Sequence, residues 1–309
     1  MEIQGLRSAY DTVGGVVYFG RMVDKIRLHA AGKLPPEYQR SLGATNPNSF
    51  DGRCCRFFKI DYHALAARAL QAGSDESLFE WACLHGRKPS DRDVEVWNAF
   101  MQKRGWRDGS SGRLKEQVEE AGIAGRVVST FFDFYDADEG RPPRFPGEPP
   151  DAKTSAEPVL GTVRIPGLRS PWEKVGGIVH FGRMLDKIRL FKKGQLPPAW
   201  AEAMGSLNGF DDFCCYLLQV EYKALQEEAL HGGGDTRMLQ WAFAHGRKPS
   251  DQEIEIWNDC LSKRCWRDKY IPRLHFRLQE AGLPTDLVLT MFEYIDLDEG
   301  RIPLSFDGD

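Results

Sequence analysis

The chain has 309 residues, of which 41% are hydrophobic and 28% charged, and its formal net charge is −4 at pH 7. This composition is typical of a globular protein, and it lacks the strong basic field that attracts nucleic acid or an anionic membrane surface. No apolar stretch approaches the roughly 18 residues of a membrane span, and the first residues lack the basic start and apolar core of a signal peptide. We therefore expect a cytoplasmic protein that binds neither nucleic acid nor membranes.

The predicted elements of the first half are helical. Residues 13–31 carry apolar side chains at helical spacing and end at Gly32, with Pro35 and Pro36 just beyond. Further helices are expected over 62–72, 75–84 and 91–105, with Asp61, Ser74 and Ser90 as their N-caps, and at about 111–121 and 125–135. Asn-Gly or Asp-Gly pairs between alternating apolar runs, which would indicate hairpins, are missing. The sequence predicts an all-α fold with about six or seven helices per repeated unit.

The sequence then repeats itself. Blocks of the first half return in the same order 160 to 162 residues later, including FGRM with DKIRL at 19–28 and 181–190, HGRKPSD at 85–91 and 245–251, and DADEGR at 136–141 with DLDEGR at 296–301. This period is far longer than the roughly 20 to 50 residues of a solenoid repeat and matches a small domain. We expect two homologous helical domains, at residues 1–141 and 167–309.

A proline-rich segment joins the two units. Residues 142–166 read PPRFPGEPPDAKTSAEPVLGTVRIP, which contains too much proline for a helix. We predict an extended, semi-rigid linker. Its length permits a monomer in which the second unit folds back on the first as an intramolecular pseudo-dimer with a pseudo-two-fold axis, and independent units on a tether are the alternative.

The seven cysteines give no sign of a disulfide framework or a zinc site. Cys54 and Cys55 recur as Cys214 and Cys215, whereas the other three have no counterpart in the opposite unit. CxxC pairs and Cys/His zinc spacings do not occur. We expect packed, structural thiols.

The order of these blocks resembles a bacterial family of unknown function called DUF5069. The resemblance is carried by VGG, FGRMVDKIRL, GKLPPEY, VEVWNAF, RGWRD and TFFDFYDADEGR, and it covers nearly all of both units. Members of the family usually hold one such unit, so the chain resembles two fused members. The resemblance supports the domain limits and the helical interpretation, and it implies no activity or catalytic residue.

Repeated charged residues on the opening helix form the first candidate site. Apolar side chains circle most of this helix, which predicts that it is buried and that its charges have partners. Either Asp24 pairs with Arg21 or Arg27 at i,i+3 spacing, or the group lines a pocket in which basic side chains bind an anion and an aspartate orients them. The candidate ligand-binding residues are Arg21, Lys25 and Arg27 with Arg183, Lys187 and Arg189, and the candidate catalytic carboxylates are Asp24 and Asp186.

The HGRKPSD block is the second candidate. Its glycine and basic residues precede a helix N-terminus, as in many anion sites, although Asp91 and Asp93 already satisfy the positive end of that helix. The block is therefore either a capped loop with solvated basic residues or a ligand contact made by Arg87 and, in the second unit, Arg247. His85 and His245 are the histidines that both units share, and they are the natural general acid or base near neutral pH.

Carboxylates at the end of each unit form the third candidate. A hard cation such as Mg²⁺ prefers carboxylate oxygens, and residues three apart on a helix share a face. The candidate metal ligands are Asp136, Asp138 and Glu139 in the first unit and Asp296, Asp298 and Glu299 in the second. The alternative is a helix end whose carboxylates pair with Arg141 or cap neighbouring amides.

The KRGWRD block is expected to contribute no site. Lys103 and Arg104 stand in the last turn of a predicted helix, where cations offset the helix dipole, and Trp97 and Trp106 are typical core residues.

Two functional classes follow from these patterns. The first is a site for a small, anionic molecule, with enzymatic activity and Mg²⁺ both open, and the second is an interaction module whose repeated charges are ion pairs and caps. A site requires these side chains to converge on one concave surface, whereas a scaffold disperses them. The units also differ at single positions, such as Tyr18 and its counterpart His180, and such changes would cluster if one unit had kept a pocket.

Overall fold

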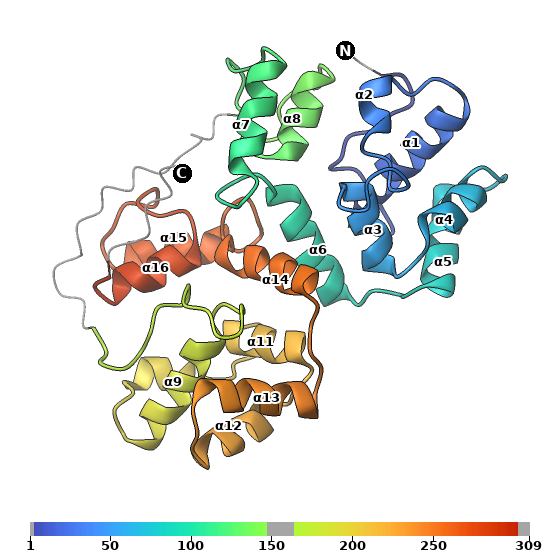
Figure 1. Ribbon diagram of the computed structural model, residues 1–309. Helices are drawn as coiled ribbons and strands as arrows, with labels where there is room; N and C mark the ends of the chain where they lie inside the picture. Colours follow the sequence, from blue (N-terminus) through green and yellow to red (C-terminus); the bar gives the residue numbers. More distant parts are fainter. Residues whose placement is uncertain (1–2, 147–163, 302–309) are drawn as a thin grey trace. The chain divides into compact units, whose positions relative to one another are not determined.

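The computed structural model of the protein describes residues 3–146 and 164–301, which divide into two compact units (Figure 1). In the described residues each unit contains eight helices, α1–α8 and α9–α16, and strand structure is restricted to a short hairpin. The all-α prediction is confirmed. The expected six or seven helices per unit become eight because the predicted ranges omitted two helices, which in the first unit are Pro36–Gln39 and Phe50–Phe58.

The first unit opens with a two-stranded ribbon, β1 (Thr12–Val13) and β2 (Val16–Val17). Its helices are α1 (Phe19–Ala30), α2 (Pro36–Gln39), α3 (Phe50–Phe58), α4 (Tyr62–Ala69), α5 (Asp75–His85), α6 (Asp91–Lys103), α7 (Ser111–Glu120) and α8 (Phe131–Asp138). The second unit repeats this order with α9 (Phe181–Lys192), α10 (Pro198–Glu202), α11 (Phe210–Leu218), α12 (Tyr222–Leu230), α13 (Asp235–His245), α14 (Asp251–Ser262), α15 (Ile271–Glu280) and α16 (Met291–Asp298).

The first predicted helix, over 13–31, is wrong in its opening turn, where the chain forms the β1–β2 hairpin. Gly14 and Gly15 have φ of +57° and +78°, the left-handed conformation that a tight two-residue hairpin turn needs. Gly176 and Gly177 repeat this turn with φ of +58° and +83° beneath a single bridge from Val175 to Ile178. A Gly-Gly pair is typical of a hairpin turn, but the helical spacing of the apolar residues that follow it favoured a helix over the whole range.

The predicted N-caps of the middle helices are confirmed. Asp61 accepts a hydrogen bond from the amide of Ala64 at 2.9 Å, and Ser74 accepts one from Ser77 at 3.2 Å. Ser90 forms a capping box with Asp93. The helix expected at 125–135 lies further along the chain, over α8, because Thr130 provides its cap.

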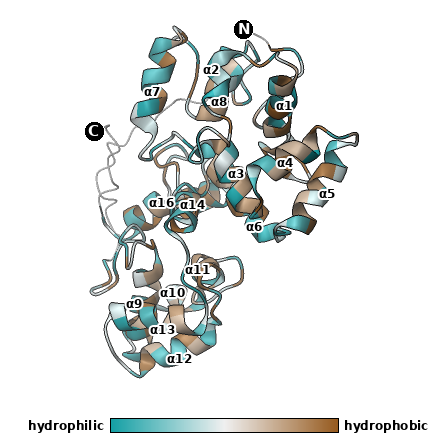
Figure 2. Ribbon diagram, turned by 45° about the vertical axis from the view of Figure 1, so that its right-hand side comes forward, coloured by the Kyte–Doolittle hydropathy of each residue, from teal (hydrophilic) through white to brown (hydrophobic). Residues whose placement is uncertain are grey.

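Helix α1 lies at the centre of its unit, as its apolar circumference predicts. Every residue from Phe19 to Ile26 is buried, and α1 contacts α3, α4 and β1. Its counterpart α9 contacts α10, α11 and α12. Most of the other helices carry hydrophilic residues on one side and hydrophobic residues on the other (Figure 2). Cys54, Cys55, Cys214 and Cys215 are buried, and burial raises the pKa of Cys55 to about 12, which suits packing residues.

The predicted linker, residues 142–166, is shorter than expected at both described ends. Phe145 packs on Tyr10 with ring centroids 6.1 Å apart, so the chain still contacts the first unit at this point. Ile165 is buried with Leu168 in an apolar cluster of the second unit. Residues 147–163 lie outside the described part of the chain. Across the described ranges, no helix has the length and apolarity needed to cross a membrane.

Gly86 provides a test of the packing between α5 and α3. A Cβ atom at this position would overlap the carbonyl oxygen of Phe58, which also accepts a hydrogen bond from the amide of Arg87 at 2.6 Å. We expect Gly86→Ala to lower the free energy of unfolding of the first unit by roughly 1–3 kcal/mol, as overpacking does. Calorimetric unfolding of the full chain measures this change.

Gly112→Ala is the matched control. A Cβ atom there meets nothing within 4 Å, and the residue lies in helix α7, so we expect a stabilisation of roughly 0.5 kcal/mol. Equal melting temperatures for the two variants would contradict this account of the α5–α3 contact.

Candidate functional site

A buried guanidinium stands at the centre of each unit. Arg21 on α1 donates to Glu139, at the end of α8, through both terminal nitrogens, and to the carbonyl of Arg7 at 2.8 Å. Arg183 and Glu299 repeat the pair in the second unit. Burial alone would raise the pKa of Glu139, but the hydrogen bonds and charges of Arg21 and Arg141 outweigh it and hold that pKa below its usual range.

Asp24 pairs with Arg7, an arginine that precedes the helix and that helical spacing does not relate to it. Arg7 donates to Asp24 from Nε at 2.6 Å and from Nη2 at 2.7 Å, and it also contacts Asp75, which accepts from Arg27 at 2.7 Å. Asp186 has the same relation to Arg169 in the second unit. The local i,i+3 pairing that the sequence suggested is present there as a contact of 3.8 Å between Arg189 and Asp186. These charges thus have partners within the protein.

The lysine of the opening helix contacts a buried aspartate. Lys25 donates to Asp51 at 2.7 Å, and Tyr18 donates to the same carboxylate at 2.9 Å. In the second unit Lys187 contacts Asp211 at 2.6 Å, and His180 takes the place of the tyrosine, with Nε2 2.8 Å from Asp211. The two units therefore share this group apart from one exchanged side chain.

His180 is neutral at physiological pH. Burial lowers its pKa to about 4, against the opposing influence of the hydrogen bond to Asp211. Because the ring is neutral, its Nε2 proton is donated to Asp211, and Nδ1 is left as a buried acceptor with no partner in the described part of the protein.

The candidates of the HGRKPSD blocks lie elsewhere on their units. His85 and His245 are exposed at the ends of α5 and α13, where each ring stacks on a tryptophan and Nδ1 lies 2.9 Å from that tryptophan's carbonyl oxygen. Arg87 contacts Asp93 at 3.0 Å, and Arg247 contacts Glu253 at 2.5 Å. The geometry is that of a capped loop, and it brings neither histidine to Asp24 or Asp186.

The carboxylates proposed for Mg²⁺ have protein partners of their own. Asp136 accepts from Ser8 at 2.8 Å and from Arg141 at 3.3 Å, and Glu139 contacts Arg141 as well as Arg21. Asp296 and Glu299 repeat these contacts with Ser170 and Arg301. Within residues 3–146 and 164–301, no three His, Cys, Asp or Glu side chains form a group that could hold a metal ion. The described geometry fits the ion-paired helix end that was the alternative interpretation.

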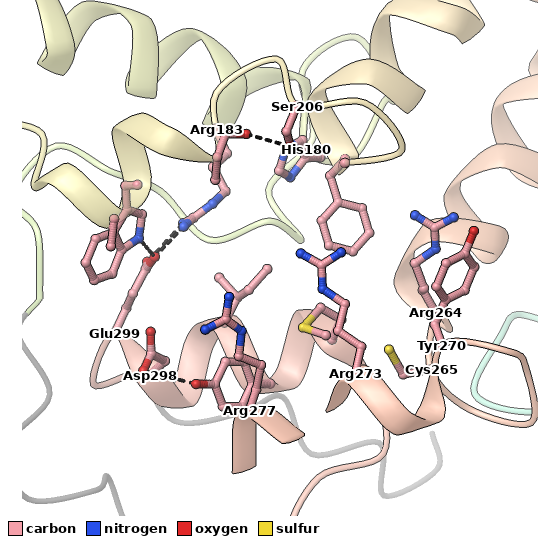
Figure 3. Close-up of a pocket in the computed structure, with 18 of the residues that line it drawn as sticks. His180, Arg183, Ser206, Arg264, Cys265, Tyr270, Arg273, Arg277, Asp298 and Glu299 are labelled. Carbon is pink, nitrogen blue, oxygen red and sulfur yellow. Dashed lines mark hydrogen bonds and ion pairs between the residues drawn. The ribbon is translucent and has the colours of Figure 1, made fainter. Parts of the chain in front are cut away.

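The second unit contains a cavity of about 260 Å³ that several of these residues line (Figure 3). Five cationic side chains line it, and they are Arg183 and Lys187 from α9, Arg264 after α14, and Arg273 and Arg277 from α15. Two carboxylates line it, Asp298 and Glu299. Its aromatic lining consists of Trp200, Phe210, Tyr270 and Tyr294, together with His180. We call this cavity the arginine pocket.

Three arginines of the arginine pocket were not identified from the sequence. Arg264 belongs to the KRCWRD block, which was expected to hold no site, yet it is buried with its guanidinium 4.1 Å from the ring centroids of both Phe213 and Tyr270. Arg273 and Arg277 are exposed on one face of α15 at i,i+4 spacing. Comparison of the units could have drawn attention to Arg277, because a glutamine, Gln117, stands at the equivalent position in the first unit.

A second hollow, of about 560 Å³, lies in the first unit. It is lined by Arg126, Arg141 and Arg144, by Asp133 and Asp136, and by prolines 142, 143 and 146. Its charges are of both signs, and Asp136 and Arg141 already contact each other, so it favours no ligand charge.

The comparisons with known proteins agree with this duplicated architecture. A family model described as a domain of unknown function, DUF5069, matches residues 3–141 and again residues 165–301. The chain belongs to the DUF5069 family. No curated protein and no solved structure matched it. The two DUF5069 domains keep the Arg–Glu pair and the Lys–Asp pair in common, and they differ at the side chains around them.

The neutral state of His180 predicts how stability depends on pH. In the unfolded chain a histidine takes up a proton below about pH 6.5, whereas folded His180 stays neutral down to about pH 4. The unfolded state therefore binds the proton first, and the free energy of unfolding of the second unit falls by about 1.4 kcal/mol for each pH unit between those values. Thermal unfolding from pH 7 to pH 4.5 measures this loss.

His180→Tyr is the control for this titration, because Tyr18 occupies the equivalent position in the first unit and donates to Asp51 there. The variant should lose roughly 2–3 kcal/mol less stability than the wild type over the same pH range. Parallel pH profiles for the two proteins would contradict a neutral, buried His180.

Proposed function

We propose that the second DUF5069 domain binds a small organic anion in the arginine pocket. The observation that carries the proposal is the excess of cationic over acidic side chains on the walls of one cavity, five against two. A guanidinium in a confined space donates several hydrogen bonds in a fixed geometry and suits carboxylate or phosphate groups.

The charges divide the pocket into a neutral side and a cationic side. On the side of α9, Arg183 is matched by Glu299 and Lys187 by Asp211, both buried. On the side of α15, Arg273 makes no side-chain hydrogen bond or ion pair to any residue that the structure describes, and the partner of Arg277 is an exposed residue, Glu280, at 3.0 Å. The α15 side therefore holds positive charge that an acidic ligand can neutralise.

The surroundings of Asp298 disfavour its charged form. Burial, and then the neighbouring charge of Glu299, raise its pKa, while a hydrogen bond from Tyr294 acts in the opposite direction. The charges of Arg277 and Arg183 also act to lower this pKa, so the carboxyl group lies within the field of the cationic side chains of the pocket. It can also donate a hydrogen bond when it is protonated.

The remaining lining predicts an organic ligand. Trp200 and Phe210 present rings to the pocket, and Met291 and Ile295 present aliphatic groups. Walls that combine apolar surface with a few charged groups are typical of sites for small organic molecules. A bare inorganic ion would leave this apolar surface in contact with water.

Thermal unfolding of the full chain against a panel of anions tests the proposal. The panel comprises inorganic phosphate, acetate, benzoate, cyclohexanecarboxylate and phenyl phosphate. A compound present at about 100 times its dissociation constant adds roughly 2.7 kcal/mol to the free energy of unfolding, which raises the melting temperature of a domain of this size by roughly 5–10 °C. We expect at least one organic anion to raise the transition of the second domain.

Arg273→Ala should reduce this shift, because it removes a cation from the α15 side of the arginine pocket. The matched control is Arg113→Ala, which removes the equivalent exposed arginine from the first domain and should leave the shift unchanged. No shift with any anion, or equal shifts in both variants, would refute the proposal.

A further inference from the structure

We propose that the ligand of the arginine pocket is an aromatic acid whose ring occupies the position that the Tyr135 side chain fills in the first domain. This inference rests on the proposed function and names its ligand class. It is based on a comparison of the two domains. Equivalent residues surround the same position in both domains, but different side chains fill that position.

In the first domain, an aromatic side chain stands against the buried arginine. The guanidinium carbon of Arg21 lies 5.0 Å from the centroid of the Tyr135 ring. Phe50 meets the same ring edge-on with centroids 6.2 Å apart, and it also meets Phe131 at 5.9 Å. The Tyr135 ring is thus held by a cation and by the edge of another aromatic ring, two contacts that favour an aromatic group over an aliphatic one.

The hydroxyl end of Tyr135 lies within the field of two arginines. Burial raises the pKa of this phenol to about 12, the charges of Arg21 and Arg113 act in the opposite direction, and the charges of Asp51 and Glu139 raise it further. The two guanidinium groups would favour an acidic substituent at the same end of a ring, against the burial and the carboxylate charges that disfavour it.

The second domain has the same residues around this position, but the two aromatic side chains that they enclose are replaced. Arg183, Phe210 and Arg273 are the counterparts of Arg21, Phe50 and Arg113, and all three line the arginine pocket. The positions of Tyr135 and Phe131 are taken by Ile295 and Met291, which line the same pocket and carry no ring.

The orientation of the arginines agrees with an aromatic ligand. In Figure 3, the side chains of Arg273 and Arg277 extend from α15 toward the side of the pocket where Arg183 and His180 lie. A ring seated against Arg183 and Phe210 would leave room for an acidic group in the part of the pocket that Arg273 lines. A benzoate-like or phenyl phosphate-like compound has this arrangement of ring and charge.

Isothermal titration of the full chain with benzoate and cyclohexanecarboxylate tests the inference. The two acids carry the same charge and are close in size, but cyclohexanecarboxylate lacks a π face. We expect benzoate to bind roughly 2- to 30-fold more tightly, the range that a cation–π contact of 0.5–2 kcal/mol gives. Equal affinities for the two acids would overturn the aromatic assignment.

Ile295→Tyr reproduces in the second domain the side chain that fills the first. We expect the variant to unfold without ligand at or above the wild-type temperature and to bind benzoate at least 10-fold more weakly. Ile295→Leu, which keeps an aliphatic group of equal size, should bind benzoate as the wild type does. Undiminished benzoate binding by folded Ile295→Tyr would overturn the inference.

Tyr135→Ile provides the reciprocal experiment. It opens the same position in the first domain, where Arg21, Phe50 and Arg113 remain, and we expect the benzoate stoichiometry to rise from one to two per chain. A folded variant that still binds one benzoate would count against the equivalence of the two positions.

These outcomes separate the inference from the proposed function. If both acids bind equally and Arg273→Ala weakens both, the ligand is an organic anion without a required ring, so the proposed function stands and the inference fails. If none of the panel compounds binds the wild type, both fail.

Discussion

The buried Arg–Glu pair is the interaction on which the rest of each domain depends. Arg21 and Glu139 are both almost fully buried, and each also has polar contacts with neighbouring segments, to the carbonyl of Arg7 and to Tyr38 and Arg141. Removing either charge would leave the other buried and unpaired, which costs roughly 3–5 kcal/mol. The opening loop, α1, α2 and the end of α8 must therefore assemble around one pair whose members are 118 residues apart in the sequence.

The same pair also sets the position of the arginine pocket. In the second domain Glu299 accepts hydrogen bonds from Arg183 and, at 2.9 Å, from Trp200, so α9, α10 and the end of α16 are held together at one wall. The shape of the space beside this wall is then decided by the neighbouring side chains of α16. An aliphatic residue there opens the space, whereas a tyrosine at the equivalent position in the first domain places a ring against the arginine. The shared Arg–Glu pair thus positions the surrounding helices in both domains, whereas the side chain that fills the space between them differs.

The sequence predicted the features that depend on residues close together in the chain, namely helix caps and helix burial. Caps such as Asp61 and Ser90 were identifiable because a cap and its helix are adjacent in the chain, and burial of α1 followed from its apolar circumference. Partners of the buried charges were not identifiable, because Arg21 bonds to a residue more than a hundred positions away and Asp24 bonds to Arg7 in a loop. The place of Arg264 in the pocket wall was not identifiable for a similar reason, since its aromatic neighbours come from segments that helical spacing does not relate.

The comparison of the two domains also indicates what the open pocket costs. Replacing a buried ring by a smaller side chain removes dispersion contacts. The free energy of unfolding of the domain then falls in proportion to the volume of the space that stays empty. Arg183 loses more than packing, because a guanidinium that stands against a ring in the first domain lines a cavity in the second. Under the proposed function, a small ring-bearing anion in the second domain would restore contacts that the first domain obtains from its own chain. Binding at this site would complete a core that the sequence of the second domain leaves unfilled.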